Sequence, residues 1–329
     1  MGLTVAAAIA AGLIAGVVAF NGRAPDADAS RDGAPPLALD AALTDPPHAD
    51  ELIAAERLYV DGQIDEARRQ FSDILHRDPA SVPAAVGEAV ARWPAGTTAR
   101  LRTLAASNPE DGLVRLHLGF ALFWEERDNQ ALRTWQEVVV LEPDTPSALR
   151  AENLLHSDMP RGRPIFVPAE ELPVELLDQP LQTQLAALED QAGTSGTARS
   201  WISLGVALQR AGRAVSAAEA FERAAELDFT SAEARTAAAL GSFTKEDPSV
   251  AFALLGPLGQ EFPDDPVVSY HLGLALLWLG QRAEARRQLN DAVVAGPVDD
   301  FYPAQAVRLL TEIDRAEAAQ SPSAPTVDE

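Results

Sequence analysis

Apolar side chains recur at helical spacing from Ala49 almost to the end of the chain. In residues 113–124, large apolar residues return every three or four positions, which gives a helix a continuous apolar face. Glycine permits the left-handed turn that ends a helix, and proline prevents its continuation. These breakers stand at Asp61-Gly62, Asp78-Pro79, Glu142-Pro143, Ala211-Gly212, Phe262-Pro263 and Leu279-Gly280. The pattern predicts an all-α fold made of paired helices.

One eight-residue motif occurs twice in this pattern. Residues 117–124 read His-Leu-Gly-Phe-Ala-Leu-Phe-Trp and residues 271–278 read His-Leu-Gly-Leu-Ala-Leu-Leu-Trp, so six of the eight positions are identical. Self-similarity over this distance is typical of repeat proteins. Because shared ancestry explains both His117 and His271, a structural role is favoured for them over a functional one.

Small and aromatic residues between the breakers also follow a fixed order. The tetratricopeptide repeat (TPR) reads W-x2-L-G-x2-Y, then A-x3-F, then P, with a period of 34 residues. The same order appears here at Trp201, Leu204, Gly205, Ala217 and Phe221. The 34-residue spacing is kept by Ala217, Ala251 and Ala285. The chain departs from the pattern at Leu208 and Phe229, which stand where tyrosine and proline are expected. It resembles the TPR family over about 49–156 and 198–314.

The resemblance implies a TPR-like solenoid of helical hairpins in two blocks, 49–156 and 198–318. Each block is expected to hold three repeats and to be closed by one capping helix, at about 146–156 and 301–318. A capping helix with one polar face shields the core of the last repeat. Duplication of a three-repeat block is the simplest origin of this arrangement.

The N-terminal residues 1–20 form a separate element. Residues 2–20 carry no charge, and as a helix they would extend about 28 Å, close to the thickness of a bilayer core. They predict a transmembrane helix, either an uncleaved anchor or a signal segment cut after Ala29. The lack of a positive charge before the apolar run favours the anchor. We expect the body to be extracytoplasmic because the preceding tail is very short; Arg23 and Arg31 favour the alternative, a cytoplasmic body.

Three further segments lack the repeat pattern. Residues 21–48 are rich in Ala, Pro and Asp and predict a disordered tether. Residues 157–197 predict a Pro-rich linker and one helix, at 181–192. The linker is too apolar around Phe166 to be fully solvated, so we expect it to lie against the protein. Residues 319–329 predict a disordered tail.

The charge and the chemistry of the chain exclude several functions. There are 49 acidic against 26 basic residues, a net charge of −23, and Lys245 is the single lysine. Such a surface argues against binding nucleic acid or anionic lipid headgroups. The chain has no cysteine, its five histidines form no metal-ligand pattern, and it has no phosphate-binding glycine loop. We expect neither an enzyme nor a cofactor.

The two copies of the motif predict a binding face. Leu118 and Leu272 lie on the face that packs within the hairpin, and an apolar, aromatic row lies on the opposite face. In TPR proteins this opposite face lines a concave groove that binds peptide segments. The predicted groove residues are Leu116, Phe120, Phe123, Trp124, Tyr270, Leu274 and Trp278. The alternative is that neighbouring helices or residues 165–174 cover these rings.

These expectations combine into a functional hypothesis. The chain is predicted to be a membrane-tethered TPR scaffold or holdase that binds a protein or peptide partner with apolar side chains. The alternative is a self-associating envelope protein whose aromatic faces are buried in a homodimer. On the first hypothesis, Trp124→Ala and Trp278→Ala should leave stability nearly unchanged, whereas Leu118→Ala and Leu272→Ala should lower it.

Overall fold

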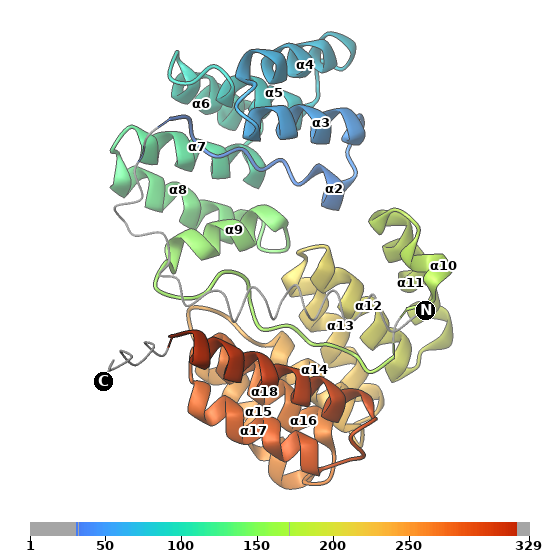
Figure 1. Cartoon of the computed structure of the whole chain (residues 1–329). Coiled ribbons are helices and arrows are strands. Elements are labelled where there is room, and N and C mark those ends of the chain that lie inside the picture. The colour runs from blue at the N-terminus through green and yellow to red at the C-terminus, as the bar shows by residue number, and fades with distance from the viewer. Residues whose placement is uncertain (1–30, 32, 171, 321–329) are drawn as a thin grey trace, which may run out of the picture.

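The computed structural model describes residues 31, 33–170 and 172–320 of the chain (Figure 1). The predicted membrane segment 2–20, residues 21–30 of the tether and the tail from 321 onward lie outside this part. Within it, no helix combines the length and the apolar character that crossing a membrane requires. The described residues form helices joined by turns and extended segments, so the all-α prediction is confirmed.

The first half of the chain holds three helical hairpins and one further helix. The hairpins are α3 (Ala49–Val60) with α4 (Ile64–Arg77), α5 (Val82–Val90) with α6 (Thr97–Ser107), and α7 (Gly112–Trp124) with α8 (Asp128–Leu141). Helix α9 (Pro146–Leu155) packs on α7 and α8. This is the order that the TPR spacing implies. The second pair is shorter than the other two.

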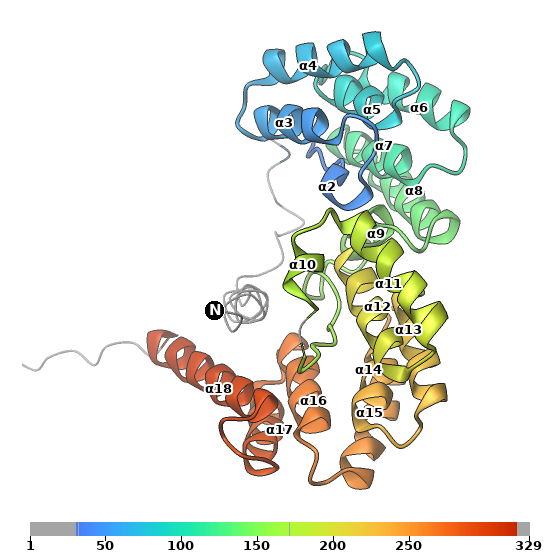
Figure 2. The ribbon, with the colours of Figure 1, turned by 90° about the vertical axis from the view of Figure 1, so that its right-hand side faces the viewer.

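The second half repeats the arrangement. Its hairpins are α12 (Ala198–Arg210) with α13 (Ala214–Leu227), α14 (Ala232–Gly241) with α15 (Ser249–Glu261), and α16 (Pro266–Trp278) with α17 (Arg282–Val294). The last helix, α18 (Phe301–Gln320), packs on α16 and α17 and runs two residues beyond its predicted end. Figure 2 shows the two halves stacked end to end as one curved array.

The repeat signature has a direct steric cause. A side chain on Gly119 would place its Cβ 2.2 Å from the indole nitrogen of Trp135, and one on Gly205 would lie 2.4 Å from the ring of Phe221. Both distances are far below van der Waals contact, so only glycine lets the aromatic ring of the second helix reach the backbone of the first. The Leu-Gly and Ala-x3-aromatic parts of the pattern therefore describe the two sides of one contact.

The predicted tether is ordered in its second part. Leu37 and Leu39 are buried in the core of the first block, and α2 (Ala41–Thr44) follows them. The prediction of disorder over 21–48 is therefore wrong for residues 33–48. Prolines keep the segment extended, and the leucines two positions apart give it an apolar edge, which helical periodicity does not detect.

The linker between the blocks packs against the protein, as its apolar residues predicted. Phe166 is only 1% exposed and belongs to the core of the second block. The short helix α10 (Val174–Leu177) and α11 (Leu181–Ser195) follow it. Helix α11 runs three residues beyond its predicted end at 192, and it is followed by Gly196, whose φ of 59° is left-handed.

Candidate functional site

Each block holds an extended segment of the chain that precedes it in sequence. Residues 33–39, here called strap 1, lie on the first block, and residues 162–168, called strap 2, lie on the second. In Figure 2 both run along the inner side of the curved array. The side chains that hold them come from helices that are far apart in sequence.

The repeat histidine of the first block binds strap 1 through its backbone. His117 Nδ1 lies 2.8 Å from the carbonyl oxygen of Leu113, and Ala38 N donates to His117 Nε2 at 3.1 Å. Because a carbonyl oxygen only accepts, Nδ1 carries the proton and Nε2 is left as the acceptor. The imidazole is fully buried, and burial lowers its pKa to about 4. The neutral ring therefore links α7 to strap 1.

Other side chains fix the position and direction of strap 1. Tyr59 Oη donates to the carbonyl of Pro35 at 2.6 Å, and Glu56 accepts from Leu39 N at 3.3 Å. Ion pairs hold both flanks: Arg31 binds Asp128 at 3.0 Å, and Arg150 binds Asp40 through two bonds of 2.5 and 3.0 Å. We call the five holding side chains cradle 1; they are Glu56, Tyr59, His117, Asp128 and Arg150.

Strap 2 is bound by the same chemistry in the second block. Val167 N donates to His271 Nε2 at 3.0 Å, and His271 Nδ1 lies 2.8 Å from the carbonyl of Val267. Burial lowers the pKa of His271 to about 4. Tyr302 Oη donates to the carbonyl of Val167 at 3.2 Å. The equivalent histidines therefore make equivalent contacts, which confirms the structural role predicted for them.

Gln209 and the side chain of Phe166 complete the binding of strap 2. The Gln209 amide accepts from Phe166 N at 3.0 Å and donates to Phe166 O at 3.1 Å, so it satisfies both backbone groups of one residue. The Phe166 ring stacks on His271 with centroids 4.6 Å apart and an interplanar angle of 13°, and meets Phe221 edge-on at 5.7 Å.

The two straps are related in sequence. When Ala38 is aligned with Val167, the shared pattern is Gly-x-Pro-x-apolar, from Gly33 to Leu37 and from Gly162 to Phe166. Both glycines have left-handed φ angles, 82° and 76°. The duplicated unit therefore includes a strap as well as three repeats. This pattern was available in the sequence, but it is short and lies inside segments that lack helical periodicity.

The predicted groove residues have different environments. Leu116, Phe120, Tyr270 and Trp278 are buried, whereas Phe123, Trp124 and Leu274 are half-buried. Leu116 and Phe120 share the first core with the strap leucines. The Arg31 guanidinium covers the Phe123 ring at 4.0 Å. Much of the predicted face is thus covered by the chain itself; that it binds a peptide of another molecule stays a prediction.

The burial of Trp278 changes the expected effect of its replacement. Its ring meets Phe243 edge-on at 5.2 Å and its Nε1 donates to the carbonyl of Arg161 at 3.4 Å. Trp278→Ala should therefore lower the free energy of unfolding by about 3 kcal/mol, because a cavity replaces the indole. The matched variant is Trp124→Ala: Trp124 is half-buried, and its indole nitrogen has no hydrogen-bond partner among the described residues. Thermal unfolding of the two variants checks this; equal melting temperatures would show that Trp278 is not a core residue.

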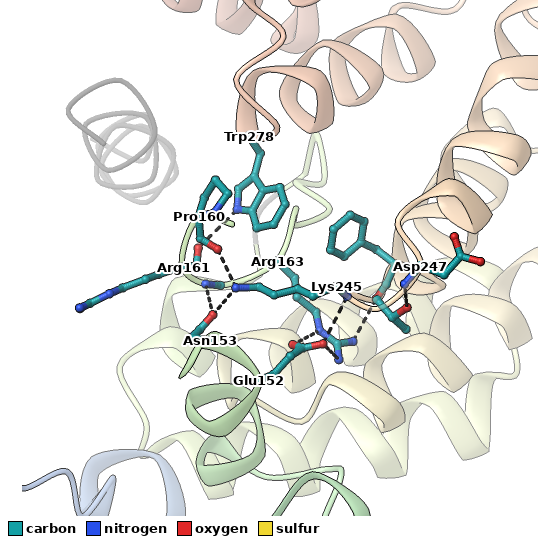
Figure 3. Close-up of polar contacts among 11 residues, drawn as sticks. Glu152, Asn153, Pro160, Arg161, Arg163, Lys245, Asp247 and Trp278 are labelled. Atoms are coloured by element: carbon teal, nitrogen blue, oxygen red, sulfur yellow. Dashed lines mark hydrogen bonds and ion pairs between the residues drawn. The ribbon is translucent and has the colours of Figure 1, made fainter. Parts of the chain in front are cut away.

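The single lysine joins the two blocks. Lys245 Nζ, in the turn after α14, donates to Asn153 Oδ1 at 2.5 Å and to the carbonyl of Pro160 at 2.6 Å. Beside it, Arg163 of strap 2 makes two bonds of 2.9 Å with Glu152 (Figure 3). Burial lowers the pKa of Lys245 to about 8. The C-terminal part of α9 is thus attached to strap 2 and to the turn after α14.

A carboxylate makes a second connection between the blocks. Asp144, before α9, accepts from Ser216 N at 2.9 Å and from Arg213 Nε at 3.1 Å, both at the start of α13. A negative charge is favourable at the N-terminus of a helix. Burial alone would raise the pKa of Asp144, but the bonds from Ser216 and Arg213 hold it below its usual value. Asp144, which precedes the capping helix α9 of the first block, therefore also caps the N-terminus of α13 in the second block.

Comparisons with known proteins bear on the fold alone. No family model and no curated protein sequence matches the chain. Among solved structures, the C-terminal part of a TPR repeat-containing protein from Cytophaga hutchinsonii is similar, with 14% identity over 79% of this chain and 99% of that chain, and a TM-score of 0.30. Yeast Tom70 shares 13% identity over 84% of this chain and 69% of Tom70, also with a TM-score of 0.30.

A third similar structure is the Cut9–Hcn1 hetero-tetramer of the APC/C, with 15% identity over 85% of this chain and 56% of that chain, and a TM-score of 0.30. The TPR-like fold of the present chain follows from its own helical hairpins rather than from these similarities. In the part of the chain that the structure describes, no group of His, Asp and Glu side chains is arranged to hold a metal ion.

Proposed function

We propose that this protein is an interaction scaffold that binds extended segments of other proteins on the inner side of its helical array. The observation that carries the proposal is the pair of straps: each block holds an extended segment through hydrogen bonds to its backbone and through apolar side chains. Backbone bonds supply affinity for extended chain, and the apolar contacts supply selectivity. Among the described residues, the same type of interaction occurs in both blocks.

The second part of the proposal is that residues 2–20 tether the scaffold to a membrane, with the body on the extracytoplasmic side. The uncharged apolar run supports it. The alternative, a homodimer that buries the aromatic faces, is less favoured, because Arg31 already covers Phe123 within one chain and the leucines of strap 1 share a core with Phe120. Resistance of the full chain to alkaline extraction from membranes tests the tether, and protease protection in intact cells tests the side.

Site-specific photo-crosslinking tests the scaffold itself. A photoreactive amino acid is placed at Phe123, beside strap 1, and in a second variant at Phe229, which is 74% exposed in the turn between α13 and α14. Partner proteins should be crosslinked in cells from position 123 and not from position 229. The same set of crosslinks from both positions, or none from position 123, would contradict the proposed function.

A further inference from the structure

We propose that cradle 1 is an exchangeable peptide site, and that strap 1 fills it until a partner segment of matching chemistry takes its place. The inference rests on the proposed function and names the ligand for one of its two sites. The partner segment is extended and reads Arg-x3-Pro-x-Φ-x-Φ-Asp, where Φ is a large apolar residue. This is the pattern of Arg31, Pro35, Leu37, Leu39 and Asp40, each of which makes a contact described above.

The contacts define the ligand class in three ways. The bonds from Tyr59, His117 and Glu56 go to backbone atoms, so they select extended chain of any sequence. The two leucines are buried in the first core and require large apolar side chains. Asp128 and Arg150 bind opposite charges at the two ends of the strap. This charge complementarity sets the direction in which a peptide can bind.

Strap 2 is held in a way that argues against exchange. It connects two folded elements, α9 and α10, and Arg163 at its start binds Glu152 and the carbonyl of Phe243. Gly162 N also donates to Asn153 at 2.9 Å. Releasing strap 2 would therefore break the junction between the two blocks. Strap 1 is not part of that junction.

The connector from strap 1 to α3, residues 41–48, has an unfavourable backbone conformation at two positions. Asp45 and His48 have left-handed φ angles, 46° and 65°. Asp and His adopt this conformation more often than most residues other than glycine, but it still costs free energy relative to the right-handed one. A short tether gives the strap an effective concentration on the order of millimolar, which normally prevents competition. A partner peptide has no such connector and avoids its backbone strain. The strain therefore reduces the advantage that strap 1 has over a partner peptide in binding cradle 1.

Release of strap 1 also has a consequence for the linker between the blocks. The Gln182 side chain of α11 donates to the carbonyl of Leu43 in α2 at 2.6 Å, and the two helices are in contact. Since α2 belongs to the connector, its movement would break this contact with α11. Occupation of cradle 1 by a partner would therefore change how the linker helix α11 is held.

Peptide binding to the full-length chain in detergent tests the exchange. The probe is a fluorescent synthetic peptide with the sequence of residues 31–42. The full-length variant Leu37→Ser/Leu39→Ser weakens strap 1 and leaves cradle 1 intact, so it should bind the probe on the order of 100-fold more tightly than the wild-type chain does. A peptide with the same two serine substitutions is the matched control and should bind neither chain.

Charge reversal identifies the site. Adding Arg150→Glu to the weakened variant should reduce binding of the probe about 10-fold, and a peptide carrying Asp40→Arg should restore it. If the weakened variant does not fold, the wild-type chain is titrated with the same two peptides, with and without Arg150→Glu. The inference is overturned if the probe binds none of the folded chains, or if charge reversal leaves its binding unchanged. Crosslinking of a partner from position 123 without peptide exchange would leave the scaffold function standing.

Discussion

Replacing Phe166 with alanine is expected to lower the free energy of unfolding by about 4–5 kcal/mol, near the upper end for an aromatic core residue. The Phe166 side chain is 1% exposed, although it belongs to a linker rather than to a repeat. Its ring stacks on His271 and meets Phe221 edge-on, so truncation leaves a cavity between strap 2 and the inner helices. Urea unfolding of residues 31–320 measures the change.

The matched control for Phe166 is the exposed Phe229. Phe229→Ala removes the same atoms from a side chain that is 74% exposed and should change the free energy of unfolding by less than about 0.5 kcal/mol. A Phe166→Ala variant as stable as Phe229→Ala would show that strap 2 is not part of the core. Strap 2 would then contribute little to the stability of the second block.

The repeats could be predicted from the sequence because their signal is local and repeated. Gly119 and Trp135 are close in sequence and face each other across one hairpin, so their spacing in the sequence is enough to predict the contact. The same spacing recurs at Gly205 and Phe221. A pattern that repeats several times in one chain identifies the hairpin even where individual positions depart from it.

The straps could not be predicted by the same reasoning. Their contacts join residues that are distant in sequence, such as Ala38 with His117 and Val167 with His271. Strap 1 has only two apolar positions at a spacing of two, in a proline-rich context that is typical of disordered segments. The burial of the linker around Phe166 was predicted because three consecutive apolar residues are costly to leave in water.

The predicted groove residues show that helical periodicity does not predict how deeply a side chain is buried. Helical periodicity places Trp124 and Trp278 on the same face of equivalent helices, yet Trp278 is buried and Trp124 is half-buried. The difference comes from Phe243 and the carbonyl of Arg161, which lie against Trp278 from the second block and the linker. A periodic pattern gives the direction of a side chain and not what covers it.

Lowering the pH from 7 to 5 is expected to destabilise the folded protein by about 2 kcal/mol for each repeat histidine. Burial lowers the pKa of His117 and His271 from 6.5 in the unfolded chain to about 4 in the fold. Between these values the unfolded chain takes up a proton at each site and the folded chain does not. The stability is therefore fully present above pH 6.5 and is lost as the pH falls towards 4, where the total reaches about 3 kcal/mol for each histidine.

The geometry explains why the folded chain resists protonation. Both nitrogens of each ring are used, and Nε2 accepts from a backbone N–H of a strap, so a proton on Nε2 would place two donors against each other. Asp40 and Arg150 lie near His117: Asp40 raises the pKa of the imidazole and Arg150 lowers it, and burial has a larger effect than either. Tyr270 and Tyr302 pack on His271, and Glu233 binds the hydroxyl of Tyr302 rather than the imidazole.

A variant that lacks both repeat histidines separates this effect from the other titrating groups. His117→Gln/His271→Gln keeps an acceptor that can reach the strap N–H, and its stability should vary less with pH than that of the wild-type chain by about 4 kcal/mol between pH 7 and 5. Burial raises the pKa of Glu56, which opposes the histidines, but this contribution is common to both proteins and cancels in the comparison. Urea unfolding of residues 31–320 at several pH values provides the curves. Parallel curves for the two proteins would contradict the assignment and would mean that the straps remain bound when the histidines are protonated.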